Sequence, residues 1–290
     1  MQKIELGRTG LLVSRMALGG YPFGGVNRAH GWDPWSTEGR ATAIATINRA
    51  IDLGVTYIDT APAYGDGNSE TLIGEVMRTR RDECVLATKV KWEGMTRDSV
   101  IASVRASLKR LQTGRLDIVQ FHGGMFTHKE YEHIVDGPLE GLLELQRGGE
   151  IGFIGLTTEE PWTARPFMRH DEFSVFQLAY NFIYQSAARN VLDDARRLNA
   201  GVVTMRTMTS GILQRAARYL APEWQDARDI YEVCLKFVLS DSRVHAAIVG
   251  MRWPEEVERN VALVNGFVPP FDFAELPRMT AHVYQAEDAE

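Results

Sequence analysis

Four polar residues of the kinds that transfer protons follow short apolar runs in this sequence. Asp59 ends one such run and Tyr64 lies shortly beyond it, while Lys89 and His122 end the next two runs. If these runs are parallel strands of one barrel, their carboxyl ends lie at the face where barrel enzymes carry their active sites. We therefore expect the four side chains to converge on one point.

Each of the four residues has a chemical use at such a point. A tyrosine hydroxyl has an ordinary pKa of ~10, too high for efficient proton exchange at neutral pH, and a nearby ammonium such as Lys89 would lower it. Asp59 would keep that ammonium charged and in place. His122 would orient a substrate oxygen or relay the proton, and an oxygen held between Tyr64 and His122 would be stabilised as it gains charge. Each residue alone also suits an ordinary core position, but the four together favour catalysis.

Eight short apolar runs alternate with longer amphipathic stretches along the chain. The runs are residues 16–19, 57–60, 85–89, 118–122, 151–156, 175–178, 202–205 and 247–250. We interpret the stretches between them as helices, with the clearest helical spacing at residues 41–53, 100–111, 138–146 and 254–263. This alternation predicts parallel strands joined by crossover helices.

The length and the number of strands favour a (β/α)8 TIM barrel. Such barrels take roughly 250 residues, so we expect a single domain over residues 1–290. Alternating residues 3–6 and 11–13 around the turn at residues 7–10 predict a short N-terminal β-hairpin. The alternative is an open doubly wound sheet with a Gly-x-Gly-x-x-Gly loop that leads into a helix. The glycines of residues 19–25 have a different spacing and precede a long polar loop.

Composition narrows the classes of partner. The net charge of −6 argues against nucleic acid or an anionic membrane surface as the main partner. Cys84 and Cys234 provide neither a disulfide framework nor a metal site, and we expect buried thiols.

No apolar run approaches the ~18 residues that span a bilayer, and no signal segment is recognised. We expect a cytoplasmic protein with a small-molecule substrate and no metal, and the oligomeric state stays open.

Three segments resemble the signature of the aldo-keto reductase family, namely residues 54–65, 107–111 and 117–122. The resemblance extends from Ile4 to Asn260 and keeps the family's order. It implies an NAD(P)(H)-dependent oxidoreductase that interconverts a carbonyl (aldehyde, ketone or sugar-like) and its alcohol without a metal. The family's four catalytic positions match Asp59, Tyr64, Lys89 and His122. Some relatives carry a cysteine-rich iron–sulfur tail, which this sequence lacks, so no cluster is expected.

The resemblance also implies a set of residues that contact the cofactor. These are Gly20, Tyr21, Asp59, Thr157, Gln177, Met205, Arg206, Gly250, Arg252, Glu256 and Asn260. Thr157 stands for a serine and Gln177 for a glutamine that contact the carboxamide, whereas Thr158 lacks the amide of the family's asparagine. Met205 replaces a stacking aromatic and offers a soft apolar platform instead. Arg206 is expected on the pyrophosphate or in an ion pair at the barrel rim.

The residues after the last strand bear on the choice of nucleotide. A helix that begins near Pro254 offers free N–H groups to an anion, and a guanidinium such as Arg252 suits a 2′-phosphate. The carboxylates of Glu255 and Glu256 would repel that phosphate, and one of them would accept from a ribose 2′-hydroxyl. We expect NADP(H) rather than NAD(H).

Aromatic residues on loops at the same end are candidates for the substrate wall. The long loop of residues 21–37 carries His30, Trp32 and Trp35, and Phe126 follows the strand of His122. We expect Trp32, Trp35 and Phe126 to contact the substrate. Two other functions stay open: an epimerase or eliminase that oxidises its substrate only transiently, and a sensor or subunit that binds the cofactor without fast turnover.

Overall fold

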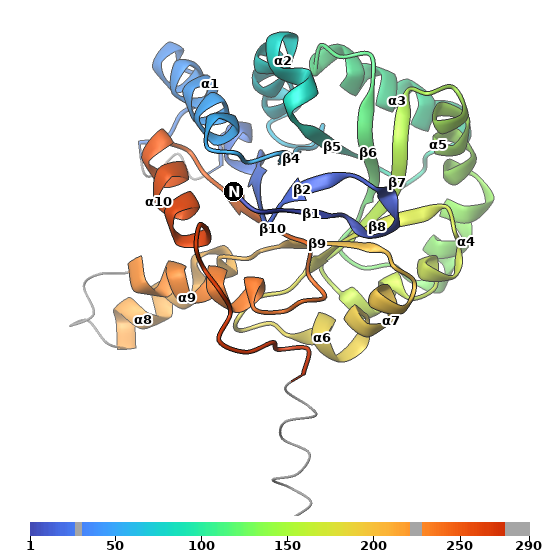
Figure 1. Ribbon diagram of the computed structural model, residues 1–290. Helices are drawn as coiled ribbons and strands as arrows, with labels where there is room; N and C mark the ends of the chain where they lie inside the picture. The colour runs from blue at the N-terminus through green and yellow to red at the C-terminus, as the bar shows by residue number, and fades with distance from the viewer. Residues whose placement is uncertain (27–30, 221–227, 276–290) are drawn as a thin grey trace, which may run out of the picture.

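The computed structural model describes residues 1–26, 31–220 and 228–275. Eight parallel strands form a closed barrel in the order β10-β3-β4-β5-β6-β7-β8-β9 (Figure 1). They are β3 (Met16–Gly19), β4 (Tyr57–Asp59), β5 (Val85–Val90), β6 (Leu116–His122), β7 (Ile151–Thr158), β8 (Phe173–Ala179), β9 (Gly201–Met205) and β10 (Ala246–Gly250). The barrel is confirmed, because every predicted strand is present and the last strand pairs with the first in parallel register.

Side chains of each strand alternate between the barrel interior and the surrounding helices. On β5, Val85 and Ala87 belong to the interior cluster, while Leu86 and Val90 pack in the outer core with the helices. This alternation directs Lys89 into the barrel at its carboxyl-terminal end.

Helices cover the outside of the barrel (Figure 1). They are α1 (Thr37–Asp52), α2 (Asn68–Arg80), α3 (Arg97–Arg110), α4 (His128–Asp136), α5 (Pro138–Arg147), α6 (Ser186–Asn190), α7 (Leu192–Arg197), α8 (Ile212–Leu220), α9 (Arg228–Leu239) and α10 (Pro254–Val264). Polar side chains fix several helix starts. Ser36 accepts from the amide of Gly39 ahead of α1, and Thr96 and Thr127 form capping boxes at α3 and α4. Proline occupies the first position of α5 and α10, as predicted.

The connection between β7 and β8 departs from the predicted repeat. It contains only the 3-10 turns Pro161–Ala164 and Phe167–Arg169 in place of an α-helix. Pro166 accounts for the break between the two turns, since a proline inside a helix lacks the N–H of a helical hydrogen bond and clashes with the preceding turn.

The predicted N-terminal hairpin is present and closes the amino-terminal end of the barrel. β1 (Lys3–Glu5) and β2 (Leu12–Ser14) pair antiparallel and lie across the barrel opening (Figure 1). Leu6 and Val13 are fully buried against interior residues such as Tyr57 and Val175. This apolar plug separates the barrel interior from solvent at the end opposite the four predicted catalytic residues.

A buried carboxylate fixes β5 from the outside. Glu70 on α2 has no exposed surface, accepts from the Thr88 hydroxyl at 2.6 Å, and pairs with Arg110 on α3 at 2.6 Å. Because Thr88 is tied outward to Glu70, its neighbour Lys89 is held inward. Two helices and a strand are thus locked together directly behind the candidate site.

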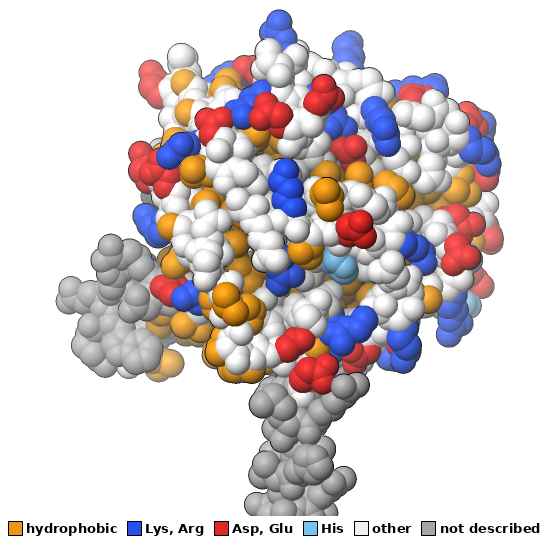
Figure 2. All heavy atoms as spheres, in the orientation of Figure 1, with side chains coloured by type: hydrophobic (Ala, Val, Ile, Leu, Met, Phe, Trp, Pro, Cys, Tyr) orange, Lys and Arg blue, Asp and Glu red, His pale blue; other side chains and the backbone are white. Residues whose placement is uncertain are grey.

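The face that carries the hairpin shows acidic and basic side chains interspersed (Figure 2). Within the described ranges, no helix is long and apolar enough to cross a membrane. Both cysteines are buried free thiols, as predicted.

Candidate active site at the carboxyl-terminal end of the barrel

Asp59 and Lys89 form an ion pair inside the barrel. Lys89 Nζ lies 2.8 Å from Asp59 Oδ1 and 2.7 Å from Oδ2, and it donates to the main-chain oxygen of Thr60 at 2.8 Å. The side chains expose only 1% and 3% of their surface, for Lys89 and Asp59 respectively. Because an ammonium has three donors and each has an acceptor here, Lys89 is fixed in orientation.

Tyr64 and His122 complete the cluster. The Tyr64 ring lies next to Lys89, with the ammonium 4.9 Å from the ring centroid. His122, the last residue of β6, meets the same ring edge-on, with centroids 5.9 Å apart and an interplanar angle of 83°. The structure therefore brings the four predicted residues together, while their catalytic roles stay a prediction.

The loops on either side of Tyr64 pack too closely for larger residues. A Cβ on Gly24 would lie 2.6 Å from the carbonyl carbon of Tyr64, and Gly65 has a φ of +63° and packs on the Gly24 main chain. Tyr21 stands edge-on to Tyr64, with ring centroids 5.1 Å apart. Gly20 donates its amide to the Asp59 main-chain oxygen at 2.7 Å. The first barrel loop thus holds Tyr64 over Lys89.

The charge states follow from burial and from these contacts. Burial alone would lower the pKa of Lys89, but Asp59 and Tyr64 outweigh burial and raise that pKa above its ordinary value, so the ammonium stays charged. Burial raises the pKa of Tyr64, and Lys89 opposes this rise. The effect of Lys89 has the predicted direction, but burial is larger, so the pKa of Tyr64 is raised and not lowered. Tyr64 is therefore protonated at neutral pH.

His122 is neutral in the folded protein. Burial, together with the positive charges of Lys89 and Lys91, lowers its pKa from 6.5 to about 3. A neutral imidazole carries one N–H and so can still donate a hydrogen bond to a substrate oxygen.

We expect the His122 ring to stay neutral across the physiological pH range. Its NMR signals should not titrate between about pH 8 and about pH 5, where an unperturbed histidine changes charge. As the pH falls, the unfolded chain protonates this imidazole at a higher pH than the folded chain does. The stabilising contribution of the neutral ring is therefore lost between about pH 6.5 and about pH 3. His122→Gln identifies the signals among those of the seven histidines. A ring that titrates near its ordinary pKa would contradict this environment.

Two predicted carboxamide ligands lie beside His122 across the barrel register. Thr157 on β7 pairs with His122 on one side and with Gln177 on the other. Both are buried, and Gln177 Oε1 accepts from Gln120 Nε2 at 2.9 Å. Gln120 Oε1 has no hydrogen-bond partner among the described residues. The pattern of the sequence did not single out Gln120, although alternation from His122 places it inside the barrel.

Met205, Thr158 and Arg206, near the ends of β7 and β9, have different surroundings. Met205 ends β9 and its sulfur lies 4.0 Å from Gln177 Nε2, so it lines the same space. The Thr158 hydroxyl instead bonds to the Gly124 main-chain oxygen at 2.9 Å and to Thr163. Arg206 is half exposed and paired with Glu159 at the rim. The ion pair foreseen for Arg206 is present, and a contact with the pyrophosphate stays a prediction.

The residues before α10 fit an anionic group. Arg252 forms no ion pair among the described residues, its Nε is buried without a hydrogen-bond partner, and its guanidinium lies 5.9 Å from the Trp253 ring centroid. Glu256 accepts from the Arg252 main-chain amide at 2.6 Å, so this carboxylate is held at the start of α10. Asn260 is largely buried and Gly250 is exposed. An unsatisfied guanidinium nitrogen beside free helix N–H groups suits a phosphate.

Two of the three residues predicted for the substrate wall are buried. Trp32 is 2% exposed, its indole N–H donates to the Pro22 main-chain oxygen at 2.7 Å, and its ring packs on Trp253. Phe126 is 4% exposed and packs against Phe167. Both rings pack against neighbouring aromatic residues and expose little surface, and their contact with a substrate stays a prediction. Trp35 is half exposed and remains a candidate, whereas His30 lies outside the described residues.

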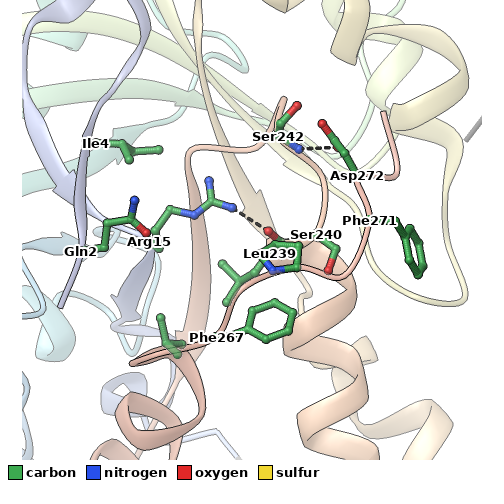
Figure 3. A pocket seen from close by; sticks show the side chains of 11 residues that line it. Gln2, Ile4, Arg15, Leu239, Ser240, Ser242, Phe267, Phe271 and Asp272 are labelled. Carbon is green, nitrogen blue, oxygen red and sulfur yellow. Dashed lines mark hydrogen bonds between the residues drawn. The ribbon is translucent and has the colours of Figure 1, made fainter. Parts of the chain in front are cut away.

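A hollow of about 520 Å³ lies at the other end of the barrel (Figure 3). Its lining includes Ile4 of the hairpin, Arg15 before β3, and Phe267 and Asp272 beyond α10. Arg15 donates to the main-chain oxygens of Leu239 and Val244, so its guanidinium links the start of β3 to the end of α9 and the segment before β10. Residues at this end of a barrel contribute to stability and not to chemistry. Across the described ranges, no cluster of side chains has the composition of a metal site.

Comparison with known proteins agrees with the barrel fold. Residues 15–282 match the family model described as "Aldo/keto reductase family". The chain is 29% identical over 223 residues to "Aldo-keto reductase YhdN" of Bacillus subtilis, covering 73% of this chain and 64% of that protein. It is 26% identical over 315 residues to "NADH-specific methylglyoxal reductase" of Escherichia coli, covering 91% and 94%. A Klebsiella pneumoniae aldo/keto reductase solved with NADP and acetate has the same fold, with a TM-score of 0.76, 21% identity, and coverage of 96% and 94%.

Proposed function

The chain belongs to the aldo/keto reductase family, and we propose that it reduces the carbonyl of a small molecule to an alcohol, or runs the reverse reaction, with Tyr64 as its acid/base. The observation that carries this proposal is the Tyr64 ring held beside the buried Lys89–Asp59 pair and against a neutral His122. This arrangement supports proton donation to an oxygen that gains charge in a site without a metal.

The chemistry divides between the residues and the nucleotide. When bound, the reduced nicotinamide supplies the hydride that the carbonyl carbon accepts. The Tyr64 hydroxyl donates its proton to the carbonyl oxygen, and His122 orients that oxygen through a ring N–H. Lys89 stabilises the tyrosinate left behind, and Asp59 keeps Lys89 charged. In the reverse direction the tyrosinate takes the proton from the alcohol.

We propose that Thr157, Gln177 and Met205 line the nicotinamide end and that Arg252 and the start of α10 hold the phosphate on the adenosine ribose. Glu256 accepts from the Arg252 main-chain amide, and the Arg252 guanidinium forms no ion pair among the described residues and has a buried Nε without a partner, so it is available to a phosphate. This supports NADP(H) over NAD(H). One curated relative, at 26% identity, is NADH-specific, so the choice needs a direct measurement.

Titration with NADPH and NADH, followed by quenching of the protein's tryptophans, tests the cofactor proposal. We expect NADPH to bind more tightly and to be consumed only when a carbonyl compound is added. Binding of neither nucleotide would contradict the proposed function. Product formation without net nucleotide consumption would indicate an epimerase or eliminase, and binding without turnover would indicate a sensor or subunit.

Replacing Arg252 with alanine should weaken NADPH binding by roughly 10- to 100-fold, the effect of losing a charged hydrogen bond, and should leave NADH binding nearly unchanged. The matched control is Arg78→Ala, which removes an exposed arginine of α2 on the outer surface. Equal losses for both nucleotides would contradict the assignment of Arg252 to the 2′-phosphate.

A further inference from the structure

Lys91 lies beside the catalytic cluster, and nothing in the proposed chemistry uses it. It follows β5 directly, and the last register pairs of β5 with β6 are Lys89 with Gln120 and Val90 with Phe121. The next residues along these two strands are Lys91 and His122. Val90, the last residue of β5, packs outward with the helices, so alternation continued by one residue would turn Lys91 to the same side as Lys89.

The charge of Lys91 acts on the catalytic end of the barrel. Its ammonium contributes to lowering the pKa of His122, which places it within electrostatic range of the imidazole. Lys91 itself is exposed to solvent and makes no ion pair with any described residue.

Two other cationic groups near the rim are paired, whereas two carboxylates there accept from neutral donors. Lys89 is paired with Asp59, and Arg206 with Glu159. Glu160 accepts from the Tyr184 hydroxyl, and Glu93 accepts from the main-chain amide of Trp92. With His122 uncharged, the ammonium of Lys91 is a positive charge next to the place where a substrate oxygen would be held, and the carboxylates of Glu93 and Glu160 offset it in part.

We propose that Lys91 binds an anionic group of the substrate, so that the preferred substrates are carbonyl compounds that carry a carboxylate or a phosphate a few bonds from the reacting carbon. This inference rests on the proposed function, which fixes the substrate oxygen between Tyr64 and His122. An ammonium on a flexible stem recognises either anion as a point charge. Solvent-exposed lysines are common, but this one is directed to the reacting end by strand register.

The test compares 4-oxobutanoate with butanal, two aldehydes of equal chain length of which one carries a carboxylate. We expect the wild-type enzyme to have the higher kcat/KM for 4-oxobutanoate. Lys91→Met should lower that kcat/KM by roughly 10- to 100-fold and leave the value for butanal within about 2-fold. Glyceraldehyde 3-phosphate, measured in the same way, distinguishes a phosphate from a carboxylate. Lys109→Met, which removes an exposed lysine of α3, is the control.

A second measurement tests the same inference without depending on which aldehyde the enzyme reduces. Butanoate and butanamide are compared as inhibitors of whichever carbonyl reduction the enzyme performs, and butanoate should inhibit more strongly in wild type but not in Lys91→Met. Equal effects of Lys91→Met on charged and neutral compounds in both assays would overturn the inference and leave the proposed function intact. An enzyme that reduces no carbonyl compound and binds neither nucleotide would overturn the proposed function itself.

Discussion

Replacing Tyr64 with phenylalanine is expected to lower kcat by about 10²- to 10⁴-fold, the usual contribution of a positioned acid/base, while the dissociation constant of NADPH changes little. The substitution keeps the ring that packs against Tyr21 and His122 and lies next to the Lys89 ammonium. Only the hydroxyl, which is the proposed proton donor to the substrate oxygen, is lost. Single-turnover kinetics together with the tryptophan-quenching titration separate the chemical step from nucleotide binding.

Tyr57→Phe provides a matched control for the loss of a hydroxyl inside the barrel. Tyr57 is fully buried, and its hydroxyl has no hydrogen-bond partner among the described residues. Removing an unsatisfied buried hydroxyl costs little or even stabilises a protein, so this variant should keep full activity. If Tyr64→Phe turned over as fast as the wild type, another group would have to supply the proton.

Replacing Lys89 with methionine should abolish turnover and also destabilise the protein by about 3–5 kcal/mol, because it leaves a buried carboxylate without its partner. Lys89 makes both contacts to the Asp59 carboxylate, and both side chains are shielded from water. Chemical denaturation measures the free energy of unfolding, and steady-state assays measure the activity.

A double variant distinguishes the structural role of the pair from its chemical role. Asp59→Asn combined with Lys89→Met removes both charges, so most of the lost stability should return while activity should not. Recovery of activity in the double variant would mean that the ammonium has no part in the reaction. An unchanged free energy of unfolding in Lys89→Met would mean that Asp59 is not effectively buried.

The barrel could be predicted because its strands are buried on both faces and therefore read as short, nearly continuous apolar runs. The same rule predicted that Asp59, Lys89 and His122 lie at the carboxyl-terminal ends of their strands. The predicted repeat failed between β7 and β8, where Pro166 interrupts the expected helix and only two 3-10 turns form. That proline is visible in the sequence, so the departure was in principle predictable from local chemistry.

The loop aromatics could not be assigned in the same way. Whether Trp32 faces a ligand or its own loop depends on contacts with Pro22 and Trp253, which are distant in sequence and set only by the folded chain. The pKa of Tyr64 also depended on burial, which the sequence does not quantify. The proposed role of Lys91, by contrast, could have been raised from the sequence, since Lys91 follows Lys89 by two residues.

Barrel closure has a consequence for how the protein folds as it is synthesised. The seam joins residues 16–19 of β3 to residues 247–250 of β10, so nearly the whole chain separates the two partners. Contacts of such long sequence separation form slowly, because the loop-closure entropy must be overcome before they contribute. Until β10 leaves the ribosome, the edges of β3 and β9 both lack a partner and are open to pairing with other chains. A nascent chain that stalls ahead of β10 would therefore expose two unpaired edge strands at once. The last strand to be synthesised thus also covers the free edge of the first barrel strand.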